Sequence, residues 1–154
     1  MVSSYQGHLQ ESTRETYPRV GEFMSHSFEG IPSDMDIYQA MELILKNRVS
    51  GAPVVEGDKV LVGILSEKDC LKLATQDTYE AQPQGGPVSN YMTREVKSVT
   101  QDTSLDEVAR IFLSNSYKKL PVVDGNQIVG VVRRHDVLMV IRDHYKKRMA
   151  FMRK

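Results

Sequence analysis

The feature that most constrains the fold is an internal repeat. "PVVEG" at residues 53–57 recurs as "PVVDG" at residues 121–125, a shift of 68 positions. "GILSEKD" at residues 63–69 is matched by "GVVRRHD" at residues 130–136, where the shift is 67. Self-similarity of this kind indicates one structural unit that occurs twice, and each unit is too small to bury its apolar face alone. We therefore expect two similar units that share their packing.

Apolar residues predict the same order of elements in both copies. Each copy contains an i, i+3, i+4, i+7, i+8 stripe, which indicates an amphipathic helix. The two stripes are Ile37, Ala40, Met41, Ile44 and Leu45, and Leu105, Val108, Ala109, Phe112 and Leu113. Asp36 and Ser104 stand at the expected N-caps, and two short apolar runs around a glycine turn follow each helix. The prediction is an α/β (α+β) fold made of two tandem β-α-β-β-α repeats.

The repeat also divides the chain into five parts. We expect a polar N-terminal tail at residues 1–17, repeats at 18–75 and 89–142, and a linker at 76–88, where proline and glycine occur without periodicity. A basic helical extension follows at residues 143–154. This extension is interpreted as a dimerisation helix or a solvated cap, with a docking site for an acidic partner or RNA as the less favoured alternative, because a short basic run is a weak signal.

Composition argues against several classes of protein. Lys plus Arg number 20 and Asp plus Glu number 20, so no overall field indicates a nucleic-acid or membrane partner. Cys70 is the only cysteine and cannot form an internal disulfide, which fits a reducing compartment. No stretch approaches the ~18 apolar residues of a membrane span, and the first residues lack the apolar core of a signal peptide. We expect a cytoplasmic protein.

The sequence lacks the common motifs of catalysis and metal binding. The four histidines are scattered, without H-x-x-x-H or C-x-x-C spacing, and there is no G-x-S-x-G, P-loop or G-x-G-x-x-G motif. Cys70 begins an apolar helical pattern and is interpreted as a small buried hydrophobe instead of a nucleophile. We therefore predict a protein that is not an enzyme and has no metal site.

The repeated unit resembles the CBS domain. Each copy has Met-Ser or Met-Thr at its start, an apolar residue followed by Pro-Val-Val-Asp/Glu-Gly in its middle, and a glycine six residues before an aspartate at its end. Two such units over residues 20–141 look like a Bateman module. The resemblance implies packing about a pseudo-two-fold axis and a homodimer formed through the helices. It also implies two clefts for an adenosine-containing regulatory ligand (AMP, ADP, ATP or S-adenosylmethionine), with no obligatory cofactor.

The resemblance assigns candidate ligand residues to each cleft. Asp69 and Asp136 would accept hydrogen bonds from ribose hydroxyls, although an acidic residue at a helix start also has a purely structural role. The first cleft is expected to contain Ile31, Ala52, Ser66, Asp69, Lys118, Lys119 and His135. The second is expected to contain Ser50, Lys68, Val99, Leu120, Arg133 and Asp136. The apolar members would hold the base, and core packing is their alternative role, favoured for Val99.

The two clefts are expected to be unequal, because Ser66 of the first copy is replaced by Arg133 in the second. A serine hydroxyl would meet phosphate, whereas a guanidinium would either clamp phosphate bidentately or fill its own cleft. We favour the clamp, because Asp136 is kept beside it.

The sequence therefore predicts a binding module that senses metabolite or energy state and acts on a separate effector protein. The alternative is a dimeric scaffold whose clefts are vestigial. Neither a membrane nor a nucleic acid is expected as a partner.

Overall fold

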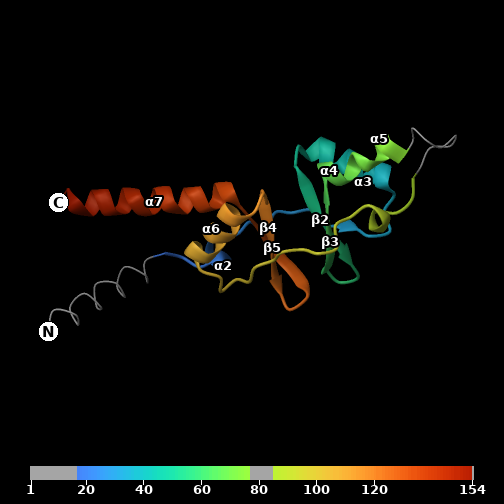
Figure 1. Ribbon diagram of the computed structural model, residues 1–154. Helices are drawn as coiled ribbons and strands as arrows, with labels where there is room; N and C mark the ends of the chain where they lie inside the picture. The colour runs from blue at the N-terminus through green and yellow to red at the C-terminus, as the bar shows by residue number, and fades with distance from the viewer. Residues whose placement is uncertain (1–16, 77–84, 154) are drawn as a thin grey trace.

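The computed structural model describes residues 17–76 and 85–153 (Figure 1). Most of the predicted tail and linker therefore lies outside the described residues. The first repeat contains β1 (Ile31–Pro32), α3 (Ile37–Asn47), β2 (Gly51–Glu56), β3 (Val60–Ser66), α4 (Glu67–Cys70) and α5 (Lys72–Gln76). The second contains η1 (Val88–Asn90), α6 (Leu105–Ser114), β4 (Lys119–Asp124), β5 (Gln127–Arg133) and α7 (Arg134–Met152). A short helix, α2 (Val20–Phe23), begins the first repeat.

The strands form one sheet in the order β1-β2-β3-β5-β4. Each repeat contributes an antiparallel hairpin, and the hairpins join where Val60 of β3 pairs with Gln127 of β5. In the first repeat β1 runs parallel to β2, with Ile31 opposite Val54. The equivalent strand of the second repeat is reduced to a single parallel bridge from Val99. The predicted α/β class is confirmed.

Each core is completed by the segment that leads into the other repeat. Tyr91 and Met92 lie near the start of the second repeat but are buried in the first core, with β2, β3 and α3. Val20 and Met24 lie near the start of the first repeat but are buried in the second core, with β4, β5 and α6. Neither repeat closes its apolar core from its own residues alone.

The packing of each leading segment against the opposite hairpin explains why both repeats have a glycine at the equivalent position, Gly63 and Gly130. A Cβ at Gly63 would lie 2.7 Å from the sulfur of Met92 and 2.9 Å from the carbonyl oxygen of Thr93. At Gly130 a Cβ would lie 2.7 Å from the sulfur of Met24. Backbone bridges between Thr93 and Ile64, and between Ser25 and Val131, hold both segments at this distance.

The predicted helices form, but the last position of each apolar stripe was wrong. Ile44 and Phe112 are buried as expected, whereas Leu45 is 61% exposed and Leu113 is 86% exposed. Successive helical residues are rotated by about 100°, so the position after Ile44 or Phe112 lies at the edge of the buried face or beyond it. The predicted N-caps are present, since Asp36 accepts from the Tyr38 N–H at 3.0 Å and Ser104 from the Glu107 N–H at 3.3 Å.

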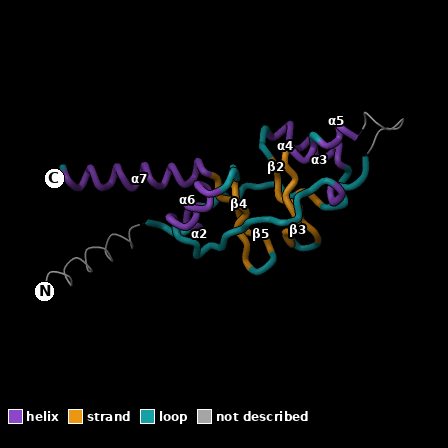
Figure 2. Tube along the Cα trace, in the orientation of Figure 1, coloured by secondary structure: helices purple, strands orange, loops and turns teal. Residues whose placement is uncertain are grey.

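Helix α7 continues well beyond the sheet, as Figures 1 and 2 show. Its first turns pack on the second repeat through Val137, which is 5% exposed. Farther along, Tyr145 and Met152 are 62% and 73% exposed. Tyr17 stacks on this helix, with its ring centroid 4.5 Å from that of His144. The predicted basic extension is thus the continuation of one long helix.

Candidate ligand site

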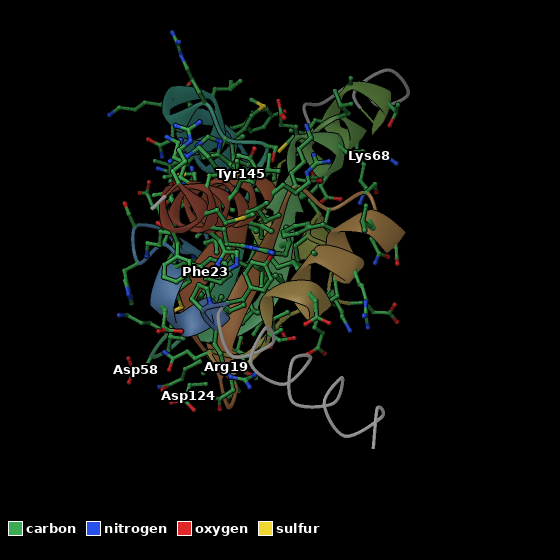
Figure 3. All side chains as sticks on the ribbon, turned by 90° about the vertical axis from the view of Figure 1, so that its left-hand side faces the viewer. Arg19, Phe23, Asp58, Lys68, Asp124 and Tyr145 are labelled. Atoms are coloured by element: carbon green, nitrogen blue, oxygen red, sulfur yellow. The ribbon has the colours of Figure 1, made fainter. Side chains whose placement is uncertain are left out.

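Two hollows lie between the repeats. The Asp69 hollow has a volume of about 520 Å³ and is formed by the start of α4, residues 93–97, residues 116–119 and Pro121. The Arg133 hollow has a volume of about 440 Å³ and is formed by residues 25–29, the end of α3, residues 51–53 and the end of β5. Figure 3 shows Lys68, a lining residue of the Asp69 hollow, at the end of the molecule opposite the hairpin residues Asp58 and Asp124.

Asp69 is the buried carboxylate of the first hollow, with 6% of its surface exposed. Its Oδ2 accepts a hydrogen bond from the backbone N–H of Ser66 at 3.0 Å, and the Ser66 hydroxyl accepts from the Asp69 N–H at 3.1 Å. The Thr93 hydroxyl donates to the same carboxylate at 3.3 Å, and the Lys72 ammonium lies 3.4 Å from Oδ1. These contacts fix the carboxylate at the wall of the hollow.

Asp136 occupies the equivalent position but has a different partner. The side chain of Arg133 donates to it twice, from Nη2 to Oδ1 at 2.8 Å and from Nε to Oδ2 at 3.2 Å. The Arg133 backbone N–H also donates to Oδ2 at 2.9 Å. The hydrogen bonds from Arg133 to Asp136 and the charge of that carboxylate raise the pKa of the guanidinium. Arg133 therefore occupies the acceptor atoms that a ribose would need.

Lys119 lines both hollows, as does Gly51, its counterpart in the other repeat. The Lys119 ammonium donates a hydrogen bond to the carbonyl oxygen of Gly51. Burial lowers the pKa of Lys119, and the positive charge of Arg133 lowers it further. A bound anion near this ammonium would offset both effects.

The predicted residues group differently from the expected clefts. Four residues expected in the first cleft do line the Asp69 hollow: Ser66, Asp69, Lys118 and Lys119. Ser50 and Lys68 line it as well, although we expected them in the second cleft.

Ile31 and Ala52 were assigned to the wrong cleft, because they line the Arg133 hollow. Each hollow combines the helix start of one repeat with the leading segment and strand of the other. The prediction correctly combined Ser66 and Asp69 with the lysines of the other repeat, but it took the apolar residues from the same repeat as the helix start.

Four further predicted residues line neither hollow. One is Asp136, which is 8% exposed and is bound to Arg133. Val99 and Leu120 are 5% and 1% exposed and belong to the second core, where core packing was their alternative role. His135 is exposed on the first turn of α7 and is absent from the lining of both hollows.

Sequence reasoning missed the role of Thr93. The Met-Thr pair at residues 92–93 was noticed only as a mark of the repeat, and the crossing of the chain that brings Thr93 to Asp69 could not be read from it. Cys70, next to Asp69, is half-buried, and burial, together with the charges of Asp69 and Glu67, raises the pKa of its thiol. A thiol held in its neutral form is a poor nucleophile.

The described part of the chain contains neither a metal-binding cluster nor a membrane-spanning helix. Across residues 17–76 and 85–153, no three His, Cys, Asp or Glu side chains gather in a way that could hold a metal ion. Within the same ranges, no helix combines the length and the apolar character that crossing a membrane requires.

Comparison with known proteins identifies the family. Residues 20–75 and residues 88–143 each match the CBS domain. The chain is a tandem CBS-domain protein. Its fold is that of a CBS pair, or Bateman module, as the sequence resemblance predicted.

Alignments with individual CBS-domain proteins extend over most of this chain. CBSX1 of Arabidopsis thaliana, a chloroplastic CBS domain-containing protein, is 30% identical over an alignment of 154 positions, which covers 82% of this chain and 65% of that protein. A crystal structure of CBSX2 in complex with AMP has a TM-score of 0.73 and 27% identity, and covers 82% of this chain and 97% of that one. The CBS pair of protein MJ0100, crystallised with 5′-methylthioadenosine and S-adenosylmethionine, has a TM-score of 0.68 at 24% identity, with coverage of 82% and 98%.

Several curated relatives are longer than this tandem CBS-domain chain. It spans 42% of MJ1225 of Methanocaldococcus jannaschii and 21% of an inosine-5′-monophosphate dehydrogenase of Aquifex aeolicus. CBS pairs thus occur in proteins with and without a catalytic domain. Since CBSX1 is chloroplastic, family membership does not assign the cytoplasmic location that we expected.

Proposed function

We propose that this protein binds an adenosine nucleotide, with AMP as the first candidate, in the Asp69 hollow, and that occupancy regulates a separate effector protein. The observation that carries the proposal is the position of Asp69, a buried carboxylate at the wall of a hollow that also contains Lys118 and Lys119 of the other repeat. A carboxylate accepts hydrogen bonds from vicinal ribose hydroxyls, and the lysines would neutralise a phosphate. The AMP complex of CBSX2 supports this ligand class.

The size and lining of the Asp69 hollow fit a nucleotide. Its volume of about 520 Å³ lies within the ~300–1,000 Å³ that is usual for small-molecule sites. Ile64, Val96 and Pro121 provide apolar surface for a base, while Ser66 and Thr93 provide hydroxyls. The Arg133 hollow is the weaker candidate, because Arg133 already holds its carboxylate.

A thermal-shift panel of AMP, ADP, ATP, S-adenosylmethionine and NAD tests the ligand. A ligand at about 100 times its Kd adds about 2.7 kcal/mol to the free energy of unfolding, so a bound nucleotide should raise the melting temperature measurably. If no member of the panel shifts the transition, the regulatory function is wrong.

Asp69→Asn tests the site. The amide keeps the shape of the side chain and an acceptor for the Ser66 N–H, but it loses the charge. We expect AMP affinity measured by calorimetry to fall by about one to two decades, which corresponds to the loss of a charge-assisted hydrogen bond worth about 1.5–3 kcal/mol.

Asp136→Asn is the matched control for that test and should leave the tightest AMP-binding step unchanged. Equal losses in the two variants would contradict the assignment of the site to the Asp69 hollow. The burial of Asp69 makes asparagine a safer substitution than alanine, because alanine would leave the Ser66 N–H without its partner.

One observation favours a second candidate function, a dimeric scaffold. Exposed leucines recur at equivalent positions of both repeats, at Leu45 and Leu113 and at Leu71 and Leu138. Apolar surface that repeats in this way is typical of an interface. A dimer that binds no nucleotide in the panel would favour the scaffold over the sensor.

A further inference from the structure

We propose that Lys119 is a cation shared by the two hollows, so that a phosphate bound in one hollow weakens phosphate binding in the other. The inference deepens the proposed function and rests on it, because it concerns the phosphate of the same ligand class. It makes Lys119 the residue that couples the two sites of the chain.

The position of Lys119 is the first argument. It is the first residue of β4, and its side chain crosses to the start of β2 in the other repeat, where the ammonium donates to the carbonyl oxygen of Gly51. Both residues line both hollows. The ammonium therefore lies at the boundary between the two spaces, within reach of either.

The second argument is that the chain cannot supply a matching cation from the equivalent position. Gly51 occupies the place in the first repeat that Lys119 occupies in the second. A Cβ at Gly51 would lie 2.7 Å from the carbonyl oxygen of Leu65 and 3.1 Å from the Cα of Ser66, and both contacts are with backbone. A symmetric pair of lysines is thus sterically excluded, and the boundary has a single ammonium.

The third argument is that the neighbouring cations do not replace Lys119. Lys118 lines only the Asp69 hollow. Arg133 is paired with Lys119 across β4 and β5, but its guanidinium is bound to Asp136. The buried position of Lys119 and the charge of Arg133 lower the pKa of Lys119, so its positive charge is costly until an anion approaches. An anion in one hollow that draws in this ammonium leaves the other hollow with less positive charge.

Calorimetry of the full chain with AMP, and with adenosine as the phosphate-free control, tests the coupling. We define the spacing of the two steps as the ratio of the second dissociation constant to the first. In the wild type we expect this spacing to be at least about ten-fold larger for AMP than for adenosine. Lys119→Met keeps the unbranched shape and removes the charge. It should weaken the first AMP by about ten-fold and bring the spacing of the two AMP steps to that seen with adenosine.

Lys118→Met is the matched control, because the neighbouring lysine lines one hollow only. Lys118→Met should weaken AMP binding but keep the wild-type spacing between the two steps. Lys119→Arg, which keeps the positive charge that Lys119→Met removes, should also show the wild-type spacing. An unchanged spacing in Lys119→Met overturns the inference, and so does the absence of a second AMP-binding step in both the wild type and Lys119→Met.

Inorganic tripolyphosphate separates failure of this inference from failure of the proposed function. If neither AMP nor adenosine binds the wild type, the proposed function is wrong. Tripolyphosphate should still bind once per chain through Lys119, and Lys119→Met should weaken it by at least ten-fold while Lys118→Met weakens it less. Equal effects of the two substitutions, or no binding of tripolyphosphate, would overturn the role of Lys119 as the shared cation.

Discussion

At the scale of single residues, Arg133 distinguishes the two copies most clearly. From the sequence we favoured a guanidinium that clamps phosphate. In the structure both donors of its fork point at Asp136, at 2.8 and 3.2 Å. Because Arg133 holds the carboxylate that was expected to bind the ribose, the other interpretation is favoured, in which the Arg133 side chain partly closes its own hollow. The serine at the equivalent position accepts from the Asp69 N–H, and its side chain does not donate to the Asp69 carboxylate. That carboxylate, which is held by the Ser66 N–H, Thr93 and Lys72, lines its hollow, whereas Asp136 does not.

Arg133→Ser tests this interpretation. The substitution recreates the Ser66 arrangement and frees Asp136, so the second adenosine should bind within about ten-fold of the first when calorimetry resolves the two steps. Arg134→Ser is the control, because Arg134 is also exposed and begins α7 but is absent from the lining of both hollows. If Arg133→Ser leaves the stoichiometry and both affinities for adenosine as they are in the wild type, Arg133 does not close its hollow.

At the scale of secondary structure, the tightest constraint is the passage of each leading segment over the opposite hairpin. Gly63→Ala should destabilise the protein by about 1–3 kcal/mol, because the new methyl group overlaps the Met92 sulfur and the Thr93 carbonyl oxygen, and the latter is held by the bridge to Ile64. Urea denaturation measures the change. Gly85→Ala is the control and should be close to neutral, since its Cβ would meet only ordinary contacts at 3.9 and 4.0 Å.

Much of each element, but not the crossing of the chain, could be read from the sequence. Periodicity and caps located α3 and α6, because helix formation depends on neighbours three and four residues apart. The partner of Met24 or Met92 is a contact between segments far apart in the chain. An apolar residue at the start of each repeat carries no signal for which of two similar cores it joins. Ile31 and Ala52 lie in the core of their own repeat, and their placement failed because the helix start beside their hollow comes from the other repeat. The sequence also could not predict the pairing of Arg133 with Asp136, because that pairing depends on the direction in which the Arg133 side chain points.

At the scale of the whole molecule, the exposed leucines point to a second copy of the chain. Leu45 and Leu113, near the ends of α3 and α6, are 61% and 86% exposed. Leu71, between α4 and α5, and Leu138, on α7, are 67% and 63% exposed. Side chains of this size are costly to leave in water. Their recurrence in both repeats gives the helical surface an approximate two-fold pattern, and such a surface suits the symmetric contact of a homodimer.

We therefore predict that the protein sediments as a homodimer at micromolar concentration, with an interface that buries at least ~1,200 Å². The double variant Leu45→Glu, Leu113→Glu should sediment as a monomer with its fold intact, because both side chains are exposed within one chain while a glutamate in an apolar interface would lose its hydration. As a control, Asn126→Glu introduces a glutamate in the β4–β5 turn, away from these leucines, and should remain dimeric. A wild type that is monomeric with and without AMP would contradict the prediction. A double variant that stays dimeric would show that the copies meet through another surface, of which the protruding part of α7, with Tyr145 and Met152 exposed, is the next to test by the same substitutions.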